Sequence, residues 1–167
     1  MRELIVTSNY YKDYTRQVLG NDLNIELKLQ KAKYVQFLNE ISESKEQYAY
    51  EKGKWTVLQV LQHIIDTERV MSYRALRFAR NDQTELPGFE QDNFANEDGS
   101  ADKNMMSIVN EFVAVRSATI EQFKNFNQTQ LARIGVTSNQ EVSVAGLGFI
   151  IVGHAIHHQS VLKDKYL

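Results

Sequence analysis

Three stretches of the chain, residues 23–41, 56–80 and 103–126, carry apolar residues at three- and four-residue spacing, which is the period of an amphipathic helix. A last stretch, residues 144–166, is expected to be helical as well. The second stretch begins with a capping box, because the side chains of Thr56 and Gln59 can satisfy each other's backbone N–H groups. Ser143 provides an N-cap for the last stretch. We therefore predict an all-α fold built on four long helices.

The segments between these helices show neither the alternation of a β-strand nor an internal repeat. Residues 1–22 are expected to form a short N-terminal lead-in segment, with room for one helical turn, and residues 135–141 a polar loop. We predict no β-strand. Residues 81–102 contain the only proline and are longer than most helix–helix connections, so they should form either a lid over a site or a crossover between parallel helices. The whole chain, residues 1–167, is predicted to be one domain.

Composition and charge argue against some classes of binding partner. The chain has 19 basic and 21 acidic residues and a net charge of -2, which argues against a nucleic-acid or membrane partner. Its densest basic feature is a row of four arginines at positions 69, 74, 77 and 80, for which ion pairs or solvation are favoured over a phosphate site. The first residues lack the apolar core of a signal peptide, and no apolar run approaches the roughly 18 residues of a membrane span. We expect a cytoplasmic protein.

The histidines are the candidate metal ligands of the chain. Three of the four, His154, His157 and His158, fall within five residues near the C-terminus. On a helix His154 and His158 share one face, whereas His157 points about 100° away from His158. Two imidazoles at this spacing can bind one metal ion, and His63 is the only further imidazole that could join them. There is no cysteine, so any metal ligands must be His, Asp or Glu.

Each of these patterns also has a purely structural interpretation. A lone histidine on an apolar helix, such as His63, is more often a hydrogen-bonded core residue than a ligand. A histidine cluster near a chain end can also be an exposed patch that takes up metal adventitiously. Trp55 and the two methionines at 105 and 106 are expected to be packing residues. Arg116 falls close to a buried stripe and should therefore have a carboxylate partner.

Four segments carry a resemblance to a known family. They are GKWTVLQVLQHIIDTERVMSYRALRFARND, LPGFEQDNFA, EFVAVRSATI and GFIIVGHAIHHQSVLKDKYL. Their order and spacing resemble the DinB superfamily, specifically its DinB-like four-helix-bundle domain, from about Tyr14 to the C-terminus. The resemblance implies an unusual connection order, with a long crossover loop between helices 2 and 3. It also implies a divalent metal held by three histidines, which map to His63, His154 and His158, while His157 matches a position that is not usually a ligand.

The resemblance implies several activities. Members include transferases that use bacillithiol or mycothiol, a mycothiol-dependent maleylpyruvate isomerase, and proteins proposed to be metal-dependent hydrolases, while many have no assigned reaction. The family name refers to damage-inducible expression and implies no DNA chemistry. Dimers are common among these relatives, so we expect a homodimer.

Three neutral imidazoles would leave a divalent cation with an open coordination position, as in catalytic zinc sites. We expect zinc or nickel, with iron or manganese as alternatives. Asp66 and Glu68 are candidate catalytic residues, as a general base or as acceptors for the ligating histidines. Asp66 has the better face, and either carboxylate could instead pair with Arg116.

The absence of cysteine bears on the reaction as well. A thiol nucleophile would have to arrive as a small-molecule substrate, because the chain has none of its own. We predict a metal-dependent transferase of a low-molecular-weight thiol of the bacillithiol type. The alternatives are a metal-dependent hydrolase of a small substrate and a non-catalytic, stress-associated metal-binding bundle.

Overall fold

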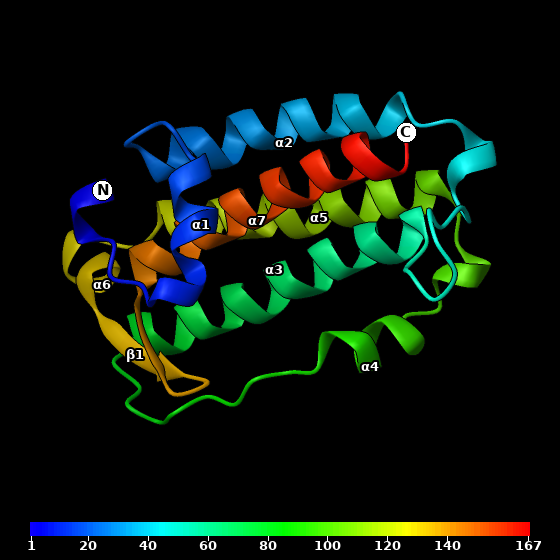
Figure 1. The fold of residues 1–167 in the computed structure, drawn as a ribbon. Coiled ribbons are helices and arrows are strands. Elements are labelled where there is room, and N and C mark those ends of the chain that lie inside the picture. The colour runs from blue at the N-terminus through cyan, green and yellow to red at the C-terminus, as the bar shows by residue number, and fades with distance from the viewer.

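The computed structural model describes all residues from 1 to 167. Four long helices lie side by side (Figure 1). They are α2 (Leu23–Asn39), α3 (Val57–Ala79), α5 (Met105–Lys124) and α7 (Val144–Lys165). The four predicted helices are therefore confirmed, with each end displaced by two residues or fewer. No helix is both long and apolar enough to cross a membrane.

The helix starts follow from side-chain caps. Thr56 Oγ1 accepts a hydrogen bond from the Gln59 N–H at 3.2 Å, and Gln59 Oε1 accepts one from the Thr56 N–H at 2.9 Å. Ser143 Oγ accepts from the Gly146 N–H at 2.9 Å and so begins α7. Because these bonds satisfy N–H groups that have no partner within the helix, they fix the residue at which each helix begins.

The order of the helices depends on the long connection after α3. In Figure 1, α2 and α7 run in one direction, whereas α3 and α5 run in the other. The segment between α3 and α5 crosses the length of the bundle and contains the short α4 (Gln91–Asn96) and the 3-10 turn η3 (Ser100–Asp102). It is therefore the predicted crossover, and the helices that it joins are parallel. A second 3-10 turn, η2 (Glu43–Lys45), lies between α2 and α3.

The N-terminal segment differs from the expectation. After the turn η1 (Arg2–Leu4), residues Asn9–Gln17 form the helix α1, which packs against α7. The prediction of a lead-in with at most one turn was wrong for this helix. Gly153 makes the contact possible, because a Cβ at this position would overlap the carbonyl oxygen of Tyr14. Gly153 thus permits the close approach of α1 to α7.

A small sheet replaces the predicted polar loop. β1 (Ile134–Thr137) pairs antiparallel with β2 (Gln140–Ser143), directly after the short helix α6 (Gln128–Ala132), so the prediction of no strand was wrong. Ser138 and Asn139 have φ values of 51° and 58°, as the two central residues of a type I′ hairpin turn require. The Leu86 N–H donates to the Val136 carbonyl at 3.0 Å, which attaches the crossover to the hairpin.

A buried ion pair connects the helices inside the bundle. Arg116 on α5 is fully buried, and its Nε and Nη2 atoms each lie 2.8 Å from a carboxylate oxygen of Glu68 on α3. Arg116 also donates a hydrogen bond to Gln30 of α2. The expectation that Arg116 has a carboxylate partner is confirmed, and Glu68 is that partner.

This pair gives a stability prediction. Replacing Glu68 by alanine leaves the Arg116 charge buried and unpaired, so we expect the free energy of unfolding to fall by about 3–5 kcal/mol in urea denaturation. The matched control is Glu121→Ala, which breaks the exposed pair with Lys124 and should cost less than about 1 kcal/mol. Equal losses in the two variants would show that the buried pair does not hold the bundle together.

Candidate metal centre

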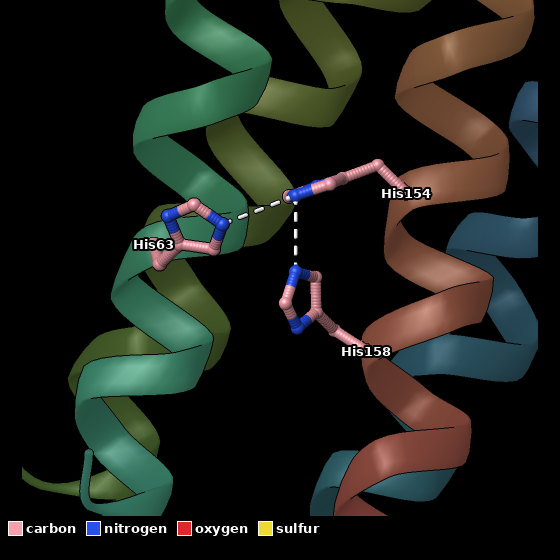
Figure 2. A group of neighbouring side chains, drawn as sticks. All are labelled: His63, His154 and His158. Atoms are coloured by element: carbon pink, nitrogen blue, oxygen red, sulfur yellow. Dashed lines mark hydrogen bonds between the residues drawn. The ribbon is translucent and has the colours of Figure 1, made fainter. Parts of the chain in front are cut away.

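Three histidines from two helices face one another (Figure 2). His63 lies on α3, and His154 and His158 lie one turn apart on α7. The Nε2 atom of His154 is 3.1 Å from the Nε2 atom of His63 and 3.1 Å from that of His158. One ring nitrogen from each residue falls within 4.8 Å of the other two. The structure therefore brings together the three residues predicted as metal ligands.

The donor set fits a divalent cation. An imidazole nitrogen carries either one hydrogen or one lone pair, so the Nε2 atom of His154 cannot form full hydrogen bonds with both neighbours. A cation can accept lone pairs from all three rings at once. In a tetrahedral zinc site with Zn–N bonds of about 2.0–2.1 Å, the ligand nitrogens lie about 3.3 Å apart, close to the two distances observed. The three histidines can therefore hold a metal ion such as zinc.

Burial keeps these rings uncharged. His63 and His154 are 7% and 6% exposed, and His158 is partly buried. Burial lowers the pKa of His63 to about 4 and, with repulsion from the neighbouring imidazoles, lowers the pKa of His158 to about 3. The pKa of His154 is lowered well below its ordinary value, mainly by burial. All three rings are thus neutral near pH 7, which is the state that binds metal.

Aromatic side chains surround the cluster. The Trp55 ring centroid is 5.0 Å from that of His63, so this packing residue also supports a site residue. The Tyr14 ring of α1 lies 5.4 Å from His154 and 5.5 Å from His157. His157 lies outside the group of three and stacks edge-on with His158. Nothing in the sequence pattern marks Tyr14 as a site residue, because its helix carries no chemical motif.

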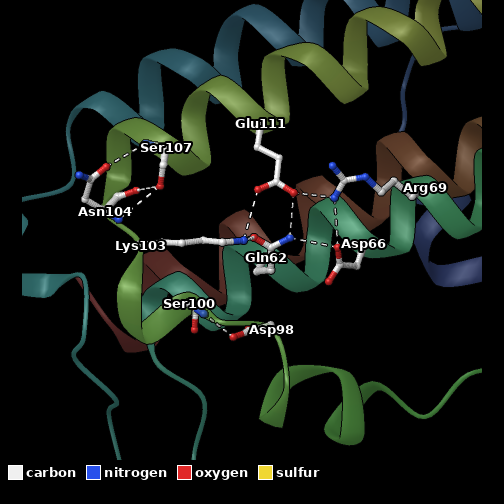
Figure 3. A network of polar contacts seen from close by, with 9 residues as sticks. All are labelled: Gln62, Asp66, Arg69, Asp98, Ser100, Lys103, Asn104, Ser107 and Glu111. Carbon is white, nitrogen blue, oxygen red and sulfur yellow. Dashed lines mark hydrogen bonds and ion pairs between the residues drawn. The ribbon is translucent and has the colours of Figure 1, made fainter.

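The two predicted catalytic carboxylates have other partners. Asp66 accepts a hydrogen bond from Arg69 at 3.3 Å, within a polar network that joins α3 to α5 (Figure 3). Glu68 pairs with Arg116, the alternative that the sequence left open. Neither carboxylate hydrogen-bonds to the histidines or lines the cavity beside them. Their catalytic roles stay untested predictions, and the contacts observed are structural.

A cavity of about 690 Å³ adjoins the cluster, and His63 and His154 form part of its wall. The remaining wall comes from α1, from the continuation of α3, from the crossover and from the tip of the hairpin. The crossover is therefore also a wall of the candidate site. Thr67, one turn after His63, lines this cavity, whereas the adjacent Asp66 does not.

The sequence model of the DinB superfamily matches residues 26–162. This chain belongs to the DinB superfamily. The match includes all three histidines of the cluster but not α1, so the tyrosines that α1 contributes to the cavity lie outside the matched DinB region. The family membership expected from the sequence is confirmed.

Comparison with solved structures agrees with the four-helix-bundle fold. YfiT from Bacillus subtilis, described as a probable metal-dependent hydrolase with an unusual four-helix bundle topology, aligns with a TM-score of 0.75. The alignment covers 85% of this chain and 82% of YfiT, at 16% sequence identity. At this identity the likeness establishes the shared bundle topology. No curated protein matches the sequence significantly.

The lowered pKa values predict acid sensitivity of this DinB fold. Between about pH 6.5 and 4, the unfolded chain binds protons that His63 and His158 in the folded chain do not, so the free energy of unfolding should fall as pH drops. The loss is up to about 1.4 kcal/mol per pH unit for each histidine. Urea denaturation of chelator-treated protein at pH 7 and pH 5 measures it. Equal stability at both pH values in wild type would contradict the buried, neutral cluster.

Proposed function

We propose that this protein is a metal-dependent enzyme that transfers a low-molecular-weight thiol to a second small substrate. In this proposal His63, His154 and His158 bind one divalent cation, with zinc or nickel as the first choices. The observation that carries the proposal is a cluster of three histidines, with no fourth protein ligand, beside a cavity of about 690 Å³. Structural zinc usually has four protein ligands, whereas catalytic zinc has three and an open position.

The surrounding residues have defined tasks in this proposal. Trp55 and Tyr14 pack against His63 and His154 and so restrict the orientation of the rings. The cavity holds the substrates beside the cluster, and its walls from α1 and the crossover limit the access of water. A thiol must enter through this cavity, because the chain has no cysteine.

The surroundings of the cluster favour a thiol over water as the nucleophile. When bound, the cation would lower the pKa of a coordinated thiol, which starts near about 8.5, far closer to neutrality than the value of about 15.7 for water. A thiol therefore needs less help from a protein base. No carboxylate hydrogen-bonds to the three histidines, and Asp66 and Glu68 are engaged elsewhere.

Hydrolysis of a small substrate is the second candidate. It is supported by the likeness to YfiT, whose description names a probable metal-dependent hydrolase. It is also supported by Glu90, an exposed carboxylate that lines the cavity and could act as a base. A metal-binding bundle without catalysis is less well supported, because the ligand set is not closed and space for a substrate adjoins it.

Metal content tests the ligand assignment. Single alanine variants at His63, His154 and His158, purified without an affinity tag, should each lose most of the metal, because two imidazoles bind far more weakly than three. Elemental analysis per chain provides the measurement. His157→Ala is the matched control and should keep the wild-type content. Full metal occupancy in His63→Ala would rule out a site shared between α3 and α7.

Conjugation assays test the reaction. Metal-loaded protein is incubated with monochlorobimane and with bacillithiol, mycothiol, glutathione or coenzyme A in turn. At least one thiol should react faster than with the His158→Ala variant, because that variant lacks one ligand. If no thiol is conjugated faster than in that control, transfer is rejected. Turnover of p-nitrophenyl esters that requires His158 would then support the hydrolase.

A further inference from the structure

Arg74 differs from the other arginines in the row on α3. Arg69 and Arg77 form ion pairs, and Arg80 is exposed. Arg74 is only 2% exposed and forms no ion pair. Its guanidinium donates to the Pro87 carbonyl at 2.7 Å and approaches a methionine sulfur at 3.5 Å. The side chain is therefore a buried cation without an anionic partner.

Burying a cation without an anionic partner raises the free energy of the folded state unless another group compensates for the charge. A guanidinium stays protonated in proteins, and the acceptors that this one meets are all neutral: the Pro87 carbonyl, the Met71 sulfur and the Tyr11 hydroxyl. Burial lowers the pKa of Arg74, and the Tyr11 hydroxyl beside it offsets this only in part. Removing a charge from water without a counter-ion is unfavourable. Arg116, the other buried arginine, has its carboxylate partner in Glu68.

Arg74 faces the same cavity as the histidines and is the only lysine or arginine in its wall. Glu90 also lines the cavity but is exposed and makes no ion pair with Arg74. An anion that enters the cavity would therefore meet one buried, unpaired cation. A guanidinium binds carboxylates and phosphates through two parallel hydrogen bonds, which makes it a selective partner for these groups.

The helix sets the distance between this cation and the histidine cluster. Arg74 follows His63 by eleven residues on α3, which is roughly 16 Å along the helix axis. Side chains on a helix lean toward its N-terminus, so the guanidinium leans toward His63. Between them Thr67 lines the cavity, is 4% exposed, and has a buried hydroxyl without a hydrogen-bond partner. Three polar positions thus follow one face of α3 along the cavity.

We infer that the cavity binds an elongated small molecule whose carboxylate or phosphate pairs with Arg74 while its reacting end lies at the histidine cluster. Thr67 hydrogen-bonds to a polar atom in the middle of this molecule. The placement of the reacting end rests on the proposed function, whereas the anion site rests on Arg74 alone. The anion is carried either by the thiol or by the second substrate.

Calorimetry with hexanoate and hexan-1-ol tests the anion site without any reaction. Wild type should bind hexanoate more tightly than hexanol, and Arg74→Gln should bind hexanoate about ten- to a hundredfold more weakly than wild type, with hexanol unchanged. Arg74→Lys should recover part of the difference. Arg80→Gln, directly after the C-terminus of the same helix and outside the cavity wall, should behave as wild type.

Two results of these titrations would contradict an anion site at Arg74. If wild type does not bind hexanoate, or if Arg74→Gln binds it as wild type does, the inference is overturned. An arginine that only anchors the crossover through Pro87 would lower the melting temperature of Arg74→Gln without changing the ratio of hexanoate to hexanol affinity. That result also overturns the inference.

A second measurement separates this inference from the proposed function. Cobalt-loaded protein is titrated with ω-mercaptoalkanoates and ω-mercaptoalkanols of increasing length, and the cobalt–thiolate absorption band is recorded. The carboxylate should strengthen binding only in chains long enough to reach Arg74, and Arg74→Gln should abolish this advantage. Competition with hexanoate shows that the thiol carries the anion, whereas hexanoate binding beside a bound mercaptoalkanol assigns the anion to the second substrate.

The two hypotheses then fail in different ways. Hexanoate binding that depends on Arg74, together with no thiol band for any probe, would refute thiol transfer and leave the anion site standing. A thiol band without an advantage of the carboxylate at any chain length would refute the span from the cluster to Arg74 and leave the proposed function standing.

Discussion

The convergence of three neutral imidazole nitrogens between α3 and α7 is the constraint on which the site depends. The Nε2 atom of His154 can form a full hydrogen bond with only one of its two neighbours at 3.1 Å, so packing elsewhere must hold the other ring in place. Trp55 and Tyr14 contact two of the rings, and burial keeps all three uncharged. A divalent cation would turn this unfavourable arrangement into a stabilising one. Metal affinity and bundle stability would therefore be coupled.

Three elements outside the four long helices complete the cavity, and one of them, α1, also lies outside the matched DinB region. α1 lies closely against α7 because Gly153 has no side chain, and this contact places Tyr14 beside His154. The crossover is held by the hairpin through Leu86 and by Arg74 through Pro87. The bundle thus supplies the histidines, while α1, the crossover and the hairpin determine the shape and charge of the space in front of them. On this account the substrate is selected mainly by those three elements.

The sequence predicts the four helices and the pair His154 and His158 well because both depend on local spacing, whereas His63 joins the pair through the family resemblance. The capping box at Thr56 and the i, i+4 pair on α7 need no information from distant residues. The rotation of α3 about its axis does depend on packing, and neighbouring residues point about 100° apart. Asp66 shares a face with His63 on a helical projection, yet Thr67 lines the cavity and Asp66 contacts Arg69. The four-residue strands of the hairpin are likewise too short to show a period.

X-ray absorption spectroscopy of zinc-loaded protein tests the central claim most directly, because it reports the ligands around the cation without a substrate. We predict three imidazole nitrogens at about 2.0–2.1 Å and a fourth position filled by a light, non-protein atom. His63→Ala should lower the imidazole count, whereas His157→Ala should not. Four imidazoles in the wild-type spectrum, or none, would contradict an open site formed by His63, His154 and His158.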